Sequence, residues 1–139
     1  MNYLLDSNAV IALMRRTPPQ VRDAILRAEA AGHEIFLSSI SLQELWYGVA
    51  RSSRPAANLR ALRELLAQGR LVWPFDADDA EATGNIRGAL SSNGKPIGPY
   101  DVLIAGQAVR RNATLVTANE KEFRRVPGLR WENWAVSKA

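Results

Sequence analysis

The stretch NYLLDSNAVIALMRR, residues 2–16, decides the class of fold. A short apolar run ends abruptly in Asp6, with Ser7 and Asn8 directly behind it, and the spacing that follows is helical. We therefore expect a strand over residues 2–6 and a helix over about 8–15. Any of the three polar residues can cap that helix. Asp6, however, also stands where a strand ends, and ligands of open α/β sheets bind at the carboxyl ends of strands.

The rest of the chain repeats this alternation of strands and helices. Further strands are predicted at 34–38, 70–75, 113–117 and 128–134. Helices are predicted at 18–32, 41–52, 55–69, 77–94 and 100–112, with one or two helical turns at 119–126. The pattern predicts an α/β fold in which a central, mostly parallel sheet of about five strands is covered by helices on both faces. The length predicts a single domain, 1–139.

Composition excludes several kinds of chemistry. The chain has no Cys and one His, His33, which excludes disulfides and thiolate metal sites and leaves no basis for a Ser-His-Asp triad or a multi-His zinc site. The net charge of +4 favours polyanionic partners such as nucleic acid, although plain solubility explains it equally well. No apolar run is long enough to span a membrane, and no signal peptide precedes the first strand, so a cytoplasmic location is expected.

Polar and acidic residues follow the predicted strands. Asp6 ends the first strand, and Glu44 lies on the first turn of the helix after the second strand, where Ser41 and Glu44 have the spacing of a capping box. Thr117 and Asn119 lie at the end of strand 113–117. Right-handed crossovers in a parallel sheet bring these strand ends and helix starts to one edge, so we expect the four residues to converge there.

A third carboxylate, Asp101, stands at the start of the helix before strand 113–117, where topology alone does not place it. Three carboxylates in one pocket repel one another unless a cation joins them. Oxygen-only ligation suits Mg²⁺ or Mn²⁺, and such an ion can activate water and hold a phosphate oxygen without a His base. Capping roles for Asp6, Glu44 and Asp101 remain open at this stage.

Four segments carry a resemblance to a known family: YLLDSNAVIAL, SSISLQELWYGVARS, GKPIGPYDVLIAGQAV and ATLVTANEKEFRRVPGLRWENW. Over essentially its whole length the chain resembles the PIN-domain ribonuclease toxins of the VapBC type. The resemblance implies a three-layer PIN-like fold and an RNA-cleaving toxin that a small antitoxin inhibits. It also implies a homodimer, for which the apolar last strand is a further reason, and RNA products with 5′-phosphate and 3′-hydroxyl ends.

The resemblance also implies roles for individual residues. Asp6, Glu44 and Asp101 form the acidic metal site, with Asp6 and Asp101 as direct ligands and Glu44 as a ligand or a residue that orients water. Asn119 occupies a position where the family often has a fourth acid; it still offers a neutral oxygen ligand and is expected to support the ion.

Neighbouring residues receive supporting roles. Asn8 and Thr117 are expected to orient Asp6 and the bound water. Glu120 and Glu122 lie close by in the sequence and could replace the missing acid, but we assign both to solvent.

Two further residues have two possible roles each. Trp46 fits core packing, or else an aromatic wall for an antitoxin helix or an RNA base. Arg87 fits a phosphate contact or a solvated face. Two other functions stay open: a non-catalytic RNA-binding or antitoxin-sequestered PIN module, and a phosphoaspartyl enzyme with Asp6 as nucleophile. The latter is disfavoured because that chemistry needs a second Asp where Asn8 stands.

Overall fold

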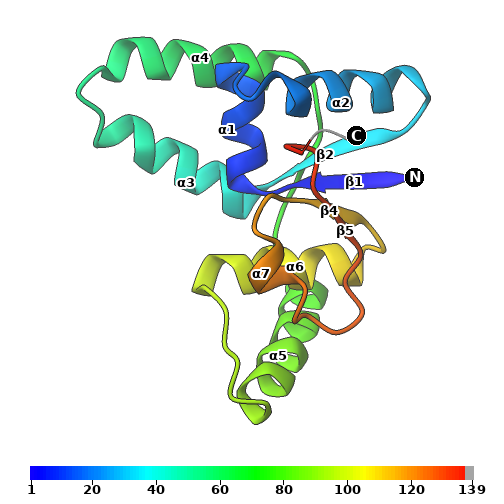
Figure 1. Cartoon of the computed structure of the whole chain (residues 1–139). Helices are drawn as coiled ribbons and strands as arrows, with labels where there is room; N and C mark the ends of the chain where they lie inside the picture. Colours follow the sequence, from blue (N-terminus) through cyan, green and yellow to red (C-terminus); the bar gives the residue numbers. More distant parts are fainter. Residues whose placement is uncertain (137–139) are drawn as a thin grey trace.

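The computed structural model describes residues 1–136, and strands and helices alternate along the chain as predicted (Figure 1). The strands are β1 (Asn2–Leu5), β2 (Glu34–Ser38), β3 (Val72–Trp73), β4 (Thr114–Val116) and β5 (Trp131–Glu132). The helices are α1 (Ser7–Arg15), α2 (Pro19–Ala30), α3 (Ser39–Ala50), α4 (Pro55–Ala67), α5 (Ala77–Ser92), α6 (Pro99–Arg110) and α7 (Glu120–Phe123). Across residues 1–136, none of these helices combines the length and the apolar character that crossing a bilayer requires.

The strands form one sheet in the order β3-β2-β1-β4-β5, and each neighbouring pair is parallel. The predicted α/β fold with a parallel sheet is therefore confirmed. The two edge strands are shorter than predicted. Pro74 directly follows β3 and has no amide hydrogen with which to continue the ladder. After β5 the chain turns, and the Trp134 ring packs against Tyr3, 4.9 Å between ring centroids.

Alternation of side chains along the central strands builds the two cores. Tyr3 and Leu5 of β1 lie in one apolar cluster with residues of α1, α2, α3 and α4, whereas Leu4 lies in a second cluster with residues of α5, α6 and α7. Figure 1 shows the first group of helices above the sheet and the second group below it. The predicted three-layer arrangement is confirmed.

A buried polar network joins the start of α5 to the end of α6. Asp79 is fully buried, and its carboxylate accepts from Gln107 Nε2 and Arg111 Nη2, both at 3.1 Å. Arg110 pairs with Asp78 at 2.9 Å. The charges of these two arginines are thus largely matched by carboxylates of the same chain.

Candidate active site

Asp6 lies where β1 ends and α1 begins. Its side chain is buried, and its Oδ1 accepts the Ala9 amide at 2.8 Å, so Asp6 rather than Ser7 caps α1. Burial raises the pKa of Asp6, hydrogen bonds from Thr117 and Ala9 lower it, and the charge of Glu44 raises it again. Asp6 is therefore a cap and also one member of a group of interacting carboxylates.

Glu44 comes to the same edge on α3, which begins earlier than predicted. Ser38, at the end of β2, is the N-cap, and its Oγ accepts the Ile40 amide at 3.1 Å. The predicted capping box of Ser41 and Glu44 is wrong: Ser41 lies inside the helix, buried, with no hydrogen-bond partner for its Oγ among residues 1–136. Glu44 consequently lies on the second turn of α3, and its charge acts on Asp6 and Asp101.

Asp101 lies in the first turn of α6, whose N-cap is Gly98, so Asp101 is not the cap of its helix. Burial, a hydrogen bond with Glu122, and the charges of Glu122, Asp6 and Glu44 together raise the pKa of Asp101 to about 7. The structure thus brings Asp101 within electrostatic reach of both other predicted acids. Topology alone did not place it there.

Glu122 is a member of this group that our reading of the sequence assigned wrongly to solvent. Its hydrogen bond with Asp101 lowers the pKa of Glu122 and raises that of Asp101, so the two carboxyl groups titrate as a pair. Asn119 Nδ2 donates to Glu122 Oε2 at 3.0 Å, and the Asn119 amide donates to Thr117 Oγ1 at 2.9 Å. The spacing of Asn119 and Glu122 across the start of α7 is the signal that could have indicated this orientation.

The remaining predicted residues were expected either to support Asp6, as Thr117 and Asn8, or to contact RNA or an antitoxin, as Trp46 and Arg87. Thr117 is buried and its side chain hydrogen-bonds Asp6, as expected. Asn8 is exposed and makes no side-chain hydrogen bond to Asp6 within residues 1–136. Trp46 is 41% exposed on α3, which contradicts its interpretation as a core residue. Arg87 is exposed at the rim of a cavity of about 360 Å³ whose wall includes the loop that leads into α6.

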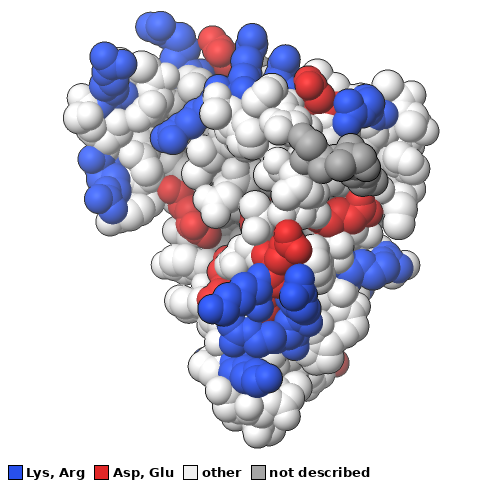
Figure 2. All heavy atoms as spheres, in the orientation of Figure 1, with Lys and Arg blue, Asp and Glu red and all other residues white. Residues whose placement is uncertain are grey.

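The acidic side chains are close enough to interact but are not arranged around one point. Within residues 1–136, no group of three or more His, Asp or Glu side chains forms a ready set of metal ligands. Figure 2 shows acidic residues near the middle of the drawn face, with a patch of Lys and Arg directly below them. The site is therefore negatively charged and bordered by positive charge.

This combination of fold and site defines a class of protein. A family model for the PIN domain matches residues 3–129, and the chain belongs to that family.

Comparison with individual proteins narrows the class. The chain is 37% identical over 135 residues to the tRNA(fMet)-specific endonuclease VapC of Shigella flexneri, covering 97% of this chain and 99% of the relative. It is 38% identical over 134 residues to the ribonuclease VapC2 of Rickettsia felis, covering 96% and 98%.

Solved structures agree with these relatives. The chain is similar to a crystal structure of VapBC2 from Rickettsia felis bound to a DNA fragment from their promoter, with 36% identity, a TM-score of 0.88, and coverage of 96% of this chain and 99% of that one. A DNA-bound VapBC from Salmonella typhimurium matches with 36% identity and a TM-score of 0.87, covering 96% and 98%. The resemblance to ribonuclease toxins of the VapBC type is confirmed.

Proposed function

We propose that this protein is a metal-dependent endoribonuclease toxin of a type II toxin–antitoxin system, which hydrolyses RNA phosphodiester bonds at Asp6, Glu44 and Asp101. The observation that carries the proposal is the gathering of these acids with Glu122 at one edge of the sheet, where burial, then the hydrogen bond with Glu122, and then the charges of Glu122, Asp6 and Glu44 raise the pKa of Asp101 to about 7. Such a group of carboxylates is costly unless a cation balances it. The near full-length similarity to VapC ribonucleases supports the same function.

The donor set fits Mg²⁺, with Mn²⁺ as a substitute, because every candidate ligand is a carboxylate or amide oxygen. When bound, such an ion supplies a polarised water and neutralises charge on a phosphate oxygen. Asp6 and Asp101 would hold the ion, and Glu44 would ligate it or orient the water. The cap on α1 and the Thr117 hydroxyl fix the Asp6 carboxylate in place.

Asn119 stands where the family often has a fourth acid. This would favour the non-catalytic alternative only if the site had no further carboxylate. Glu122 supplies that carboxylate, and Asn119 fixes its position through Nδ2. We therefore favour the catalytic function over a non-catalytic RNA-binding or antitoxin-sequestered module. Asn119 acts on the site through Glu122 and offers its own oxygen to the ion or its water.

RNA is the proposed substrate and a VapB-type protein the proposed antitoxin. Two relatives, from Shigella flexneri and Salmonella typhimurium, are named as tRNA(fMet)-specific endonucleases, so initiator tRNA is the first RNA to test. Trp46, with Tyr47 at 62% exposed, offers an aromatic surface on α3 for an antitoxin helix. Arg87 is proposed as an RNA contact because it borders the loop that leads to Asp101.

We also propose a cytoplasmic homodimer. Trp131 and Trp134 pack within the two cores of their own chain, so the apolar character of the last strand is weaker support for a dimer than the sequence suggested. Among residues 1–136, β5 is an edge strand of the sheet, and we propose that a second copy contacts it. Light scattering after gel filtration at micromolar concentration tests this, and a clean monomer contradicts it.

The test of the function is cleavage of initiator tRNA by purified protein. We expect cleavage in Mg²⁺ or Mn²⁺ and none in EDTA. Asp6→Asn should remove cleavage while it keeps the fold, because Asn Oδ1 can still accept the Ala9 amide. Binding of RNA without turnover in Mn²⁺ would favour the non-catalytic alternative.

A further inference from the structure

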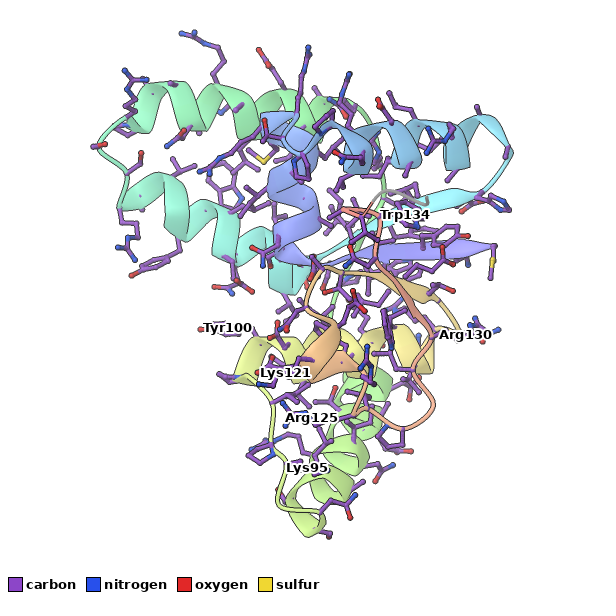
Figure 3. The ribbon with its side chains drawn as sticks, in the orientation of Figure 1. Lys95, Tyr100, Lys121, Arg125, Arg130 and Trp134 are labelled. Atoms are coloured by element: carbon purple, nitrogen blue, oxygen red, sulfur yellow. The ribbon has the colours of Figure 1, made fainter. Side chains whose placement is uncertain are left out.

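A group of positively charged side chains borders the acidic site. Lys95 lies in the loop before α6, Lys121 lies on α7, and Arg125 follows α7. Figure 3 labels the three along one side of the molecule, running from α7 toward the end of α5, and Figure 2 shows positive charge at the same place. We call Lys95, Lys121 and Arg125 the basic track.

The track is connected to the acidic site by a chain of contacts. Arg125 Nε donates to the Lys121 carbonyl at 3.2 Å, and Arg125 Nη1 donates to the Pro96 carbonyl at 3.4 Å. Lys121 directly precedes Glu122, which shares a hydrogen bond with Asp101. The positive charges therefore start next to the proposed catalytic acids and continue to the loop that carries Lys95.

The charges of the track are available to a ligand. Lys95 and Lys121 are exposed and form no ion pair with a carboxylate in the part of the chain from 1 to 136. Both hydrogen bonds of the Arg125 guanidinium go to neutral carbonyls, which hold the group in place, while its charge also acts on Glu122 and lowers the pKa of that carboxyl. Arg111, by contrast, pairs with Asp76 and Asp79.

An aromatic residue lies at the acidic end of the track. Tyr100 is 51% exposed on the first turn of α6, directly before Asp101. An exposed tyrosine ring offers a face on which a nucleobase can stack, whatever the identity of the base. Figure 3 shows Tyr100 beside the start of α6.

We infer that Lys95, Lys121 and Arg125 bind successive phosphates of single-stranded RNA on one side of the scissile bond, with Tyr100 as a stacking platform next to the acids. The inference rests on the proposed function. An RNA strand brings negative charge to a site that is itself negative, so adjacent positive charge is needed to hold it there. Dispersed cations with one exposed ring fit RNA better than a protein helix, which needs a contiguous apolar surface.

The test measures binding separately from cleavage. A short fluorescein-labelled oligouridylate is titrated with protein in EDTA, and anisotropy gives Kd at several salt concentrations. Lys95→Gln/Lys121→Gln should weaken binding about 10-fold and reduce the slope of log K against log salt by about 1.4, or about 0.7 for each lost phosphate contact. The matched control is Arg60→Gln/Arg63→Gln, which removes the same charge from the exposed side of α4 and should leave both values unchanged.

Tyr100 is tested with a conservative pair of variants. Tyr100→Ala should weaken binding roughly 10-fold with the salt slope unchanged, because stacking involves no counterion release. Tyr100→Phe keeps the ring and should restore wild-type affinity. Loss of affinity in both variants would contradict stacking and would point to the hydroxyl instead.

The outcomes separate this inference from the proposed function. If wild-type protein cleaves RNA in Mn²⁺ but the track variants bind like the control, the track is wrong and the function stands. If wild-type protein does not cleave but binding still depends on Lys95 and Lys121, the nuclease function is wrong and the track stands. Unchanged RNA affinity together with a loss of antitoxin affinity would assign the surface to a protein partner and would contradict the inference.

Discussion

Asp101 and Glu122 share a hydrogen bond between their carboxyl groups, although one lies at the start of α6 and the other on α7. Burial of Asp101, together with this hydrogen bond and the charges of Glu122, Asp6 and Glu44, raises its pKa to about 7, and the same bond lowers the pKa of Glu122. Two carboxyl groups that share a hydrogen bond hold one proton between them near neutral pH. They hold none when a bound cation replaces that proton.

The raised pKa of Asp101 predicts that stability of the metal-free protein depends on pH. The folded state keeps a proton that the unfolded state releases near the ordinary pKa of 3.8, so this contribution is complete below pH 3.8 and is lost as pH rises toward about 7. The lowered pKa of Glu122 acts in the opposite direction, but only below its ordinary value of 4.5, where its contribution is lost as pH falls.

The measurement is the melting temperature of wild type and Asp101→Asn in EDTA between pH 5 and 8. The variant should gain on wild type as pH rises, by about 4 °C, the shift that ~1 kcal/mol produces in a domain of this size. Mg²⁺ should narrow the difference by stabilising wild type. A variant that melts far below wild type at every pH would show that Asp101 has a structural role instead.

Glu122 is predicted to matter for cleavage although the sequence assigned it to solvent. Glu122→Gln should reduce the cleavage rate at least about 10-fold and weaken the response to Mg²⁺, because it removes a charge from the acid group. The matched control is Glu120→Gln on the same helix, since Asn133 and Arg124 already bind that carboxylate. Equal activity of the two variants would remove Glu122 from the site.

Close packing of α5 on α6 predicts a stability effect at Gly106. A Cβ on Gly106 would lie 2.8 Å from Thr83 Cα and would also overlap the Thr83 hydroxyl, so Gly106→Ala should destabilise the protein by roughly 1–3 kcal/mol or more. Gly88→Ala on α5 meets open space and should be neutral or stabilising by up to ~1 kcal/mol. Urea unfolding of both variants checks this, and equal effects would contradict the packing.

Exposure of Trp46 predicts that it anchors the antitoxin. Trp46→Ala should weaken antitoxin binding by about 2 kcal/mol or more with little change in melting temperature. Leu71→Ala, which removes another exposed apolar side chain between α4 and β3, is the control and should bind normally. Unfolding of Trp46→Ala with residual binding unchanged would return Trp46 to the core and move the antitoxin surface elsewhere.

The fold was predictable because local patterns decide it. Short apolar strands and amphipathic helices in alternation leave little choice but a parallel sheet between helical layers, and Asp6 was identifiable because it ends such a strand. The cap of α3 was not predictable in the same way. Several serines follow β2, and the end of the strand, which depends on pairing with β1 and β3, selects Ser38 over Ser41.

The candidate site was predictable only in part. Residues at strand ends, such as Asp6, follow from topology. Asp101 and Glu122 depend on how the starts of α6 and α7 lie against each other, which no local pattern encodes. The family resemblance assigned Asp101 to the acidic site but did not assign Glu122 to it. In the family the fourth acid often stands at the position of Asn119, so Glu122 was not expected to replace it.

The most direct test of the central claim is the chemistry of the RNA ends. Cleaved RNA is analysed by mass spectrometry after reaction in Mg²⁺, in EDTA, and with Asp6→Asn. Attack of water on phosphorus at a carboxylate-bound cation predicts 5′-phosphate and 3′-hydroxyl ends with wild type in Mg²⁺, and no cleavage in the other two reactions. Products that end in 2′,3′-cyclic phosphate and persist in EDTA would show attack by the ribose hydroxyl without a metal, and would contradict the account.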